Sequence, residues 1–194
     1  MLVPLYGAAL GAGAAELCLW LRGTLPASFL NIAVVLLWAL FARLPREAER
    51  TAGPRSGTGA LAITVAALAR WQALNNLVTP RYVAALIACQ AVPRAAMIAL
   101  AWTSRPAGEA GYRFANNINM PGALVAIATG IAAACFCGVR AAIAILGASY
   151  LVVRAAQYWC YRRSSGVNAN ALAVTEQFLE IFVLVLFTCP ECRW

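Results

Sequence analysis

The stretch with the clearest capacity for chemistry runs over residues 162–170 and reads Arg-Arg-Ser-Ser-Gly-Val-Asn-Ala-Asn. An apolar run follows it, so the Gly-containing turn stands where a helix should begin. The first residues of a helix offer free backbone N–H groups to an anion, and Arg162 and Arg163 can each make bidentate contacts to a phosphate. The stretch therefore predicts a phosphate-binding site at a helix start, with Gly166 making the turn flexible.

The helix expected after this turn carries acids inside its apolar run, at Glu176 and Glu180, with Gln177 beside the first of them. Positions three and four apart share a helical face, so these three side chains can all point into the protein. Ionisable groups in a membrane span are costly unless they are paired or functional. A plainer interpretation stays open, in which the arginine pair anchors the span, Asn170 caps the helix and Glu180 pairs with an Arg of another span.

A second cluster begins with Arg94, which follows Pro93 inside an apolar run, and continues over residues 105–114. Arg94 lies too deep in its run to act only as an anchor at the membrane surface. It needs a carboxylate, a carbonyl or a water-filled cavity as a partner, and Glu180 and Glu16 are the candidates. A structural ion pair and a contact to substrate are both consistent with such a residue.

The residue inventory excludes whole classes of chemistry. The 194 residues contain no Asp, His or Lys; all 15 cations are Arg, all seven acids are Glu, and the formal net charge is +8. The chain therefore has no imidazole base, no His ligand for a metal, no Schiff-base amine and no Asp-rich magnesium cluster of the kind common in phosphoryl transfer. Any chemistry must use Arg, Glu, Asn and backbone groups.

The composition is that of a membrane protein, because 63% of the residues are apolar and 11% are charged, against about 25% charged in soluble domains. The Arg residues punctuate apolar runs, so we expect a lipid bilayer and a phosphate-bearing substrate as partners and no nucleic acid. The first run has no basic segment before it, which favours a span over a cleaved signal peptide. We predict an all-α bundle of six to seven transmembrane helices in one domain, 1–194, with spans at 2–21, 26–42, 59–78, 82–102, 120–138, 141–160 and 171–188.

The distribution of Arg predicts how these spans are oriented. With seven spans, one face of the membrane receives eight Arg residues and the other receives four. The positive-inside rule places the eight-Arg face, and with it the N-terminus, in the cytoplasm. The eight are Arg43, Arg46, Arg50, Arg55, Arg105, Arg113, Arg162 and Arg163, and the four are Arg22, Arg81, Arg140 and Arg193.

Small residues recur through the spans and predict close helix packing. Gly7 and Gly11 form a Gly-x-x-x-Gly pair in the first span, and such pairs let two helix backbones approach each other. Contacts of the same kind can also form between two copies of the chain, so a homo-oligomer is an open alternative.

Most of the seven Cys stand in apolar runs as small hydrophobic residues, and the Cys-x-x-Cys at 189–192 has no second pair and no His to complete a zinc site.

Four segments resemble the cobalamin synthase family, the integral-membrane adenosylcobinamide-GDP ribazoletransferases. Residues 92–96 and 105–114 resemble the family's Arg in a span followed by a short Gly-containing loop that ends in an aromatic residue. Residues 165–174, followed by Glu180, resemble the family signature G-G-x-T-G-D-x-x-G-A and the Glu in the helix after it. Residues 55–59 are similar to the end of a family run D-S-R-x-G-x-x-G.

The sequence departs from the family where the family carries acids. The family run H-x-D-G-x-x-D-x-x-D-G should follow the second span, but residues 42–50 contain neither Asp nor His, and Glu47 and Glu49 lie there among three Arg at a different spacing. Asn168 and Asn170 stand where the later signature has Thr and Asp. An amide offers one carbonyl oxygen without charge, so an Asp-to-Asn change weakens a magnesium site.

The resemblance implies a protein of the bacterial cytoplasmic (inner) membrane that acts in cobalamin (vitamin B12) biosynthesis. It would transfer the adenosylcobinamide phosphate group from adenosylcobinamide-GDP to alpha-ribazole or its 5'-phosphate and release GMP, using Mg2+ if active. Two alternatives stay open: a catalytically inactive relative that binds a corrinoid or nucleotide, and an unrelated small membrane transporter or scaffold. The implied catalytic residues are Glu180, Asn170 and Asn168, the implied metal ligands are Glu180 and Asn170, and the implied substrate-binding residues are Arg94, Arg105, Arg113, Arg162, Arg163, Gly166 and Gln177.

Overall fold

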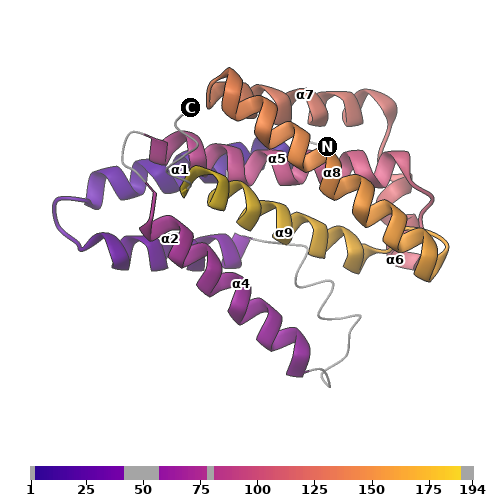
Figure 1. The fold of residues 1–194 in the computed structure, drawn as a ribbon, viewed down its shortest axis with the longest axis horizontal. Coiled ribbons are helices and arrows are strands. Elements are labelled where there is room, and N and C mark those ends of the chain that lie inside the picture. The colour runs from indigo at the N-terminus through magenta and orange to yellow at the C-terminus, as the bar shows by residue number, and fades with distance from the viewer. Residues whose placement is uncertain (1–2, 42–56, 78–80, 189–194) are drawn as a thin grey trace.

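The computed structural model describes residues 3–41, 57–77 and 81–188, and nearly all of this part is helical (Figure 1). Within these residues, seven helices coincide with the seven predicted spans, and one further helix, α6, lies between two of them, so the predicted all-α bundle is confirmed. The helices are α1 (Val3–Leu21), α2 (Ala27–Phe41), α4 (Gly57–Asn75), α5 (Tyr82–Thr103), α6 (Gly108–Asn116), α7 (Met120–Phe136), α8 (Val139–Ser164) and α9 (Ala169–Thr188).

The predicted linker over 104–119 contains the short helix α6, which the sequence analysis missed. Glu109 lies in the first turn of α6 and Arg113 in its last, the order that the helix dipole favours. The axis of α6 bends by 91° into α7, and the Asn119 side chain caps α7 by accepting a 3.0 Å hydrogen bond from the backbone N–H of Gly122. The Gly and Pro residues of this linker predict a loop, but Gly108 begins α6 and Gly111 lies within it.

Four of the described helices are long and apolar enough to cross a bilayer, namely α1, α5, α8 and α9. A fifth crossing results if the bent pair α6 and α7 counts as one span, and α2 is a shorter apolar helix. Within the described residues, four or five spans thus meet both criteria, against the six to seven predicted. The chain is a multi-pass membrane protein.

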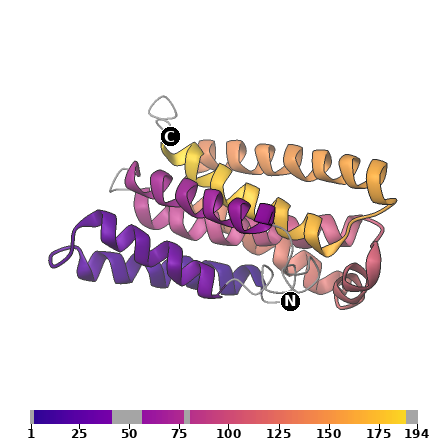
Figure 2. The same cartoon turned by 90° about the horizontal axis from the view of Figure 1, so that it is seen from below.

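Helix α5 forms the centre of the bundle. It packs mainly on α1, α7 and α9, and in Figure 2 it lies between α1 and α8. Gly11 of α1 approaches α5 so closely that a Cβ atom there would overlap the carbonyl oxygen of Leu86. A Cβ atom at Gly130 of α7 would likewise overlap the Cβ of Ala95. The predicted close packing through small residues is therefore confirmed.

The bundle has two ends with different connections. At one end, the sulfur of Cys137, after α7, lies 3.5 Å from the carbonyl oxygen of Ala84 in the first turn of α5. At the opposite end lie α6, the end of α8 and the start of α9 (Figure 1). We call residues 104–119 and 162–170, which form this second end, the arginine end.

Successive long helices run in opposite directions, as the orientation predicted from the Arg residues requires. The side of the membrane on which each end of the bundle lies stays a prediction. Part of that distribution lies outside the described residues, as do the acids next to it and the Cys-x-x-Cys. These positions are Arg43, Arg46, Glu47, Glu49, Arg50, Arg55, Cys189, Cys192 and Arg193.

Candidate functional site

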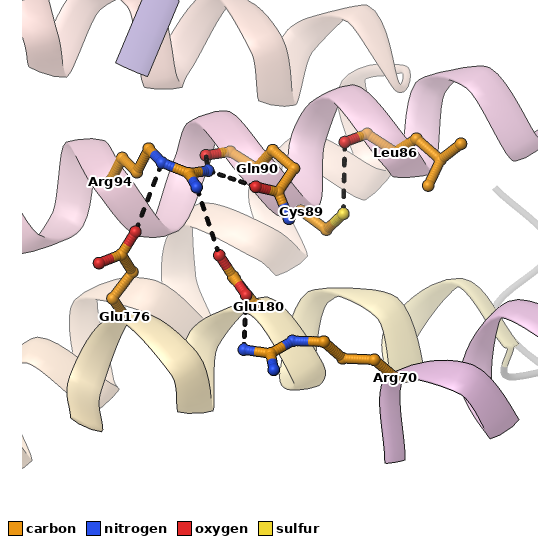
Figure 3. A network of polar contacts seen from close by, with 7 residues as sticks. All are labelled: Arg70, Leu86, Cys89, Gln90, Arg94, Glu176 and Glu180. Atoms are coloured by element: carbon orange, nitrogen blue, oxygen red, sulfur yellow. Dashed lines mark hydrogen bonds and ion pairs between the residues drawn. The ribbon is translucent and has the colours of Figure 1, made fainter. Parts of the chain in front are cut away.

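Four charged side chains from three helices meet inside the bundle (Figure 3). Glu180 of α9 lies between two guanidinium groups: its Oε2 is 2.6 Å from Nη2 of Arg70 on α4, and its Oε1 is 3.8 Å from Nη2 of Arg94 on α5. Glu176, one turn earlier on α9, has its Oε1 3.4 Å from Nε of Arg94. We call Arg70, Arg94, Glu176 and Glu180 the buried charge network.

Arg94 has a partner for each of its three nitrogens. Its Nε and Nη2 face the two glutamates, and its Nη1 donates 2.5 Å hydrogen bonds to both the backbone oxygen and the side-chain Oε1 of Gln90, four residues earlier. Gly7 of α1 leaves the space for this arrangement, because a Cβ atom there would lie 2.9 Å from Cδ and Nη1 of Arg94. Arg94 is therefore held from every side within the bundle.

The network is balanced in charge and shielded from solvent. It contains two positive and two negative groups, and the four side chains are exposed by 14% or less. Burying charges costs several kcal/mol per ion, so an internal pair adds little net stability, whereas removal of one partner typically costs ~3–5 kcal/mol. Two buried nitrogens, Nε2 of Gln90 and Nε of Arg70, have no hydrogen-bond partner within the described part of the chain.

The structure thus selects between the two partners expected for Arg94. Glu180 is the partner, as predicted, and Glu16 is exposed on α1. The role of Arg70 and the pairing role of Glu176 were not predicted from the sequence. The position of Arg70 inside an apolar run, the signal that singled out Arg94, could have found it.

The arginine end is held together by a junction between two segments that are distant in the sequence. The backbone of Arg105 and Ala107 pairs with that of Val167: Val167 N–H donates to the Arg105 oxygen at 2.8 Å, and Ala107 N–H donates to the Val167 oxygen at 2.9 Å. The N–H of Arg105 also donates a 2.8 Å hydrogen bond to the Tyr161 hydroxyl. The two clusters that the sequence singled out, 105–114 and 162–170, are therefore neighbours.

Two glycines allow this junction to close. A Cβ atom at Gly166 would lie 2.7 Å from the Arg105 oxygen and 3.1 Å from the Ala107 Cβ. At Gly111 of α6, a Cβ atom would lie 3.0 Å from the oxygen of Val167. Gly166 is buried in the junction, so its backbone contacts the 105–107 segment directly.

The amide side chains at the start of α9 have separate surroundings. Asn168, and not Asn170, caps the helix: its Oδ1 accepts a 2.8 Å hydrogen bond from the backbone N–H of Ala171. Asn170 is exposed, and Gln177 is half-buried at the edge of the face that carries Glu176. The alternative expectation that Asn170 serves as the cap is therefore wrong, because the helix starts two residues before the predicted position.

The remaining arginines predicted to bind substrate are all exposed at the arginine end. Arg113 pairs with Glu109 along α6 at 2.5 Å, with both side chains at least 78% exposed. The guanidinium carbons of Arg162 and Arg163 lie 5.0 and 5.1 Å from the ring centres of Tyr158 and Trp159. Arg105 is exposed next to the junction.

The buried charge network and the arginine end are two distinct places. Arg94 precedes the last residue of α5, Thr103, by nine positions, which is about 14 Å along the helix axis. Glu180 follows Asn170 by ten positions on α9, about 15 Å. A magnesium ion holds its ligands at ~2.1 Å, so these two side chains cannot share one, and both Glu180 oxygens face arginines.

The donor set in the described residues does not fit a magnesium ion elsewhere either. No group of three or more His, Cys, Asp or Glu side chains lies together in the ranges 3–41, 57–77 and 81–188. We therefore assign no chemical step to a metal on the basis of these residues.

The fold defines a polytopic membrane protein, a helical bundle with an internal arginine–glutamate network and an arginine-rich end. Comparison of the sequence with known protein families identifies its family. The family model described as cobalamin-5-phosphate synthase matches residues 52–188, which is more than half of the chain and includes both places described above. The chain belongs to the cobalamin synthase family, as predicted, and this places it in cobalamin biosynthesis with corrinoid substrates. No curated protein and no solved structure matches the chain.

Proposed function

We propose that this chain transfers the adenosylcobinamide phosphate group from adenosylcobinamide-GDP to alpha-ribazole or its 5'-phosphate, with release of GMP, at the cytoplasmic membrane of a bacterium. The observation that carries the proposal is the family match over residues 52–188, which spans the arginine end with its two joined segments.

The proposed reaction is a displacement at phosphorus. A ribazole hydroxyl oxygen forms a bond to the phosphorus atom that carries cobinamide, the bond from that phosphorus to the GMP oxygen breaks, and the hydroxyl proton passes to water. Negative charge develops on the leaving phosphate, and fixed cationic donors stabilise such charge. Arg105 and Arg113 supply cations at the arginine end, and the first N–H groups of α9 supply donors beside Asn170.

In this proposal the buried charge network positions the site and does not contact the phosphates. Glu180 ties α4 and α5 to α9, whose first residues form part of the arginine end. Loss of Glu180 would therefore shift the start of α9 without removing any group that touches substrate. Glu180 acts here as a positioning residue.

A second candidate function is binding of the corrinoid nucleotide without turnover. It is favoured by one observation: the buried acids Glu176 and Glu180 are held by arginines away from the arginine end, and Glu109, the acid described at that end, is paired with Arg113. A relative that has lost its catalytic acids would keep the fold and the phosphate-binding cations.

An assay of the purified full chain separates the two. The protein in lipid vesicles is incubated with adenosylcobinamide-GDP and alpha-ribazole, with magnesium, with manganese or with a chelator, and corrinoid product and GMP are separated by chromatography. Equal amounts of product and GMP support the transferase, and retention of the corrinoid nucleotide without GMP release supports the binding protein. Neither product nor binding under any condition contradicts both.

A further inference from the structure

Helix α8 is longer than the membrane interior that it crosses and is the most lipid-accessible of the candidate spans. Its 26 residues extend about 39 Å, against about 30 Å for the hydrocarbon core of a bilayer. Only 22% of its most apolar window is buried in the protein, compared with 72% for α5. If α8 runs close to the membrane normal, one or both of its ends extend into the headgroup region.

The exposed face at the end of α8 changes character in the order that a membrane surface demands. Cys160 is buried on the opposite side of the helix, and the Tyr161 hydroxyl contacts the junction. The outward face carries apolar, then aromatic, then cationic side chains, all of them exposed. These are Leu151 and Ala155, then Tyr158 and Trp159, then Arg162 and Arg163. Arg154 is also exposed beside this strip, where its Nη1 donates a 2.6 Å hydrogen bond to Oε1 of Gln157.

The two arginines of this face are held by rings and not by acids. Arg162 stacks on Tyr158 and Arg163 on Trp159, each four residues earlier, with the rings 61% and 55% exposed. Among the described residues, no ion pair to a carboxylate involves either arginine. A guanidinium stacked by its face keeps its N–H edge available for a phosphate.

We propose that Arg162 and Arg163 form a binding site for the headgroup of an anionic phospholipid. The pair adds two adjacent positive charges to a strip of apolar and aromatic side chains, so one lipid molecule can place its acyl chain on Leu151 and its phosphate on the arginines. Charge complementarity selects an anionic lipid over a zwitterionic one. The inference does not rest on the reaction proposed above.

The experiment measures lipid contact at Trp159 of the full chain in phosphatidylcholine vesicles. Fluorescence quenching by phosphatidylglycerol with brominated acyl chains is compared with quenching by brominated phosphatidylcholine at the same mole fraction, and the Trp159→Phe variant isolates the Trp159 signal. We expect phosphatidylglycerol to occupy the site about thirtyfold more strongly, since each of the two surface arginines favours anionic lipid by about 1 kcal/mol. Equal quenching by the two lipids in the wild-type chain would overturn the proposal.

Variants test whether the arginine pair is responsible. Arg162→Gln with Arg163→Gln should abolish the preference, and the double Lys variant should keep part of it because it keeps the charge. Arg140→Gln is the matched control, as Arg140 is exposed at the other end of α8 and lies next to Val139, and it should leave the preference unchanged. An unchanged preference in the double Gln variant contradicts the proposal.

A last arm separates lipid from soluble phosphate ligands. Guanosine diphosphate is added to wild-type vesicles at an ionic strength matched with sodium chloride. The lipid preference should be the same in both solutions. If the nucleotide alone removes the preference, the arginine pair is a site for a soluble phosphate and the proposal fails.

Discussion

The buried charge network and the arginine end use the same cation in opposite ways. In the network, Arg70 and Arg94 are matched by Glu176 and Glu180 inside the protein, where an unpaired charge would be intolerable. At the arginine end, the arginines are exposed, and three of them contact a surface glutamate or aromatic rings. The difference indicates that the buried arginines are committed to glutamate partners within the bundle, whereas the exposed ones are available to phosphate groups.

The largest effect should follow loss of the central acid. Glu180→Gln leaves two buried guanidinium groups with one carboxylate, so we expect a loss of ~3–5 kcal/mol of unfolding free energy. Denaturation of the detergent-solubilised protein, followed by circular dichroism, measures it. Retention of wild-type stability would show that the network is solvated, and the contrast between the two regions would disappear.

A second variant sharpens the same point by restoring the balance of charge. Arg70→Gln combined with Glu180→Gln removes one charge of each sign. The double variant should be more stable than the sum of the single variants predicts, by ~1–3 kcal/mol, because paired groups in contact are coupled. Strict additivity in the double-mutant cycle would mean that Arg70 and Glu180 do not interact.

The junction at the arginine end provides a packing test of intermediate size. Gly166→Ala would place a Cβ atom 2.7 Å from the Arg105 oxygen, and such overpacking typically costs ~1–3 kcal/mol. Gly147→Ala on α8 is the control, because no atom lies within 4 Å of the Cβ there, and it should be neutral or stabilising by up to ~1 kcal/mol. If both substitutions change the melting temperature alike, the junction is not closely packed.

The smallest effect is expected at the exposed ion pair. Glu109→Gln removes the partner of Arg113 on α6, where both side chains are at least 78% exposed, and surface pairs contribute at most ~1 kcal/mol. The free energy of unfolding should change by no more than ~0.5 kcal/mol. A loss as large as that expected for Glu180→Gln would remove the distinction between the buried and the exposed arginines.

Much of the fold and part of the site follow from the sequence. The apolar runs locate the seven long helices, and the depth of Arg94 predicts its pairing with Glu180, because a charge in a span requires a partner. The pairing with Arg70 was not predicted, since the packing of α4 against α9 is tertiary information. Helix α6 was missed because Gly108 and Gly111 indicate a loop locally, while the junction with Val167 provides the contacts that order it.

The central proposal is that exposed arginines at one end of the bundle hold the diphosphate of the corrinoid nucleotide. Equilibrium binding of adenosylcobinamide-GDP, followed by corrinoid absorbance, tests it directly with wild type, the Arg105→Gln and Arg113→Gln double variant, and Arg140→Gln. We expect the double variant to bind at least about tenfold more weakly, since a charge-assisted hydrogen bond is worth ~1.5–3 kcal/mol, and the control to bind as wild type does. Equal affinity of all three proteins would contradict the account.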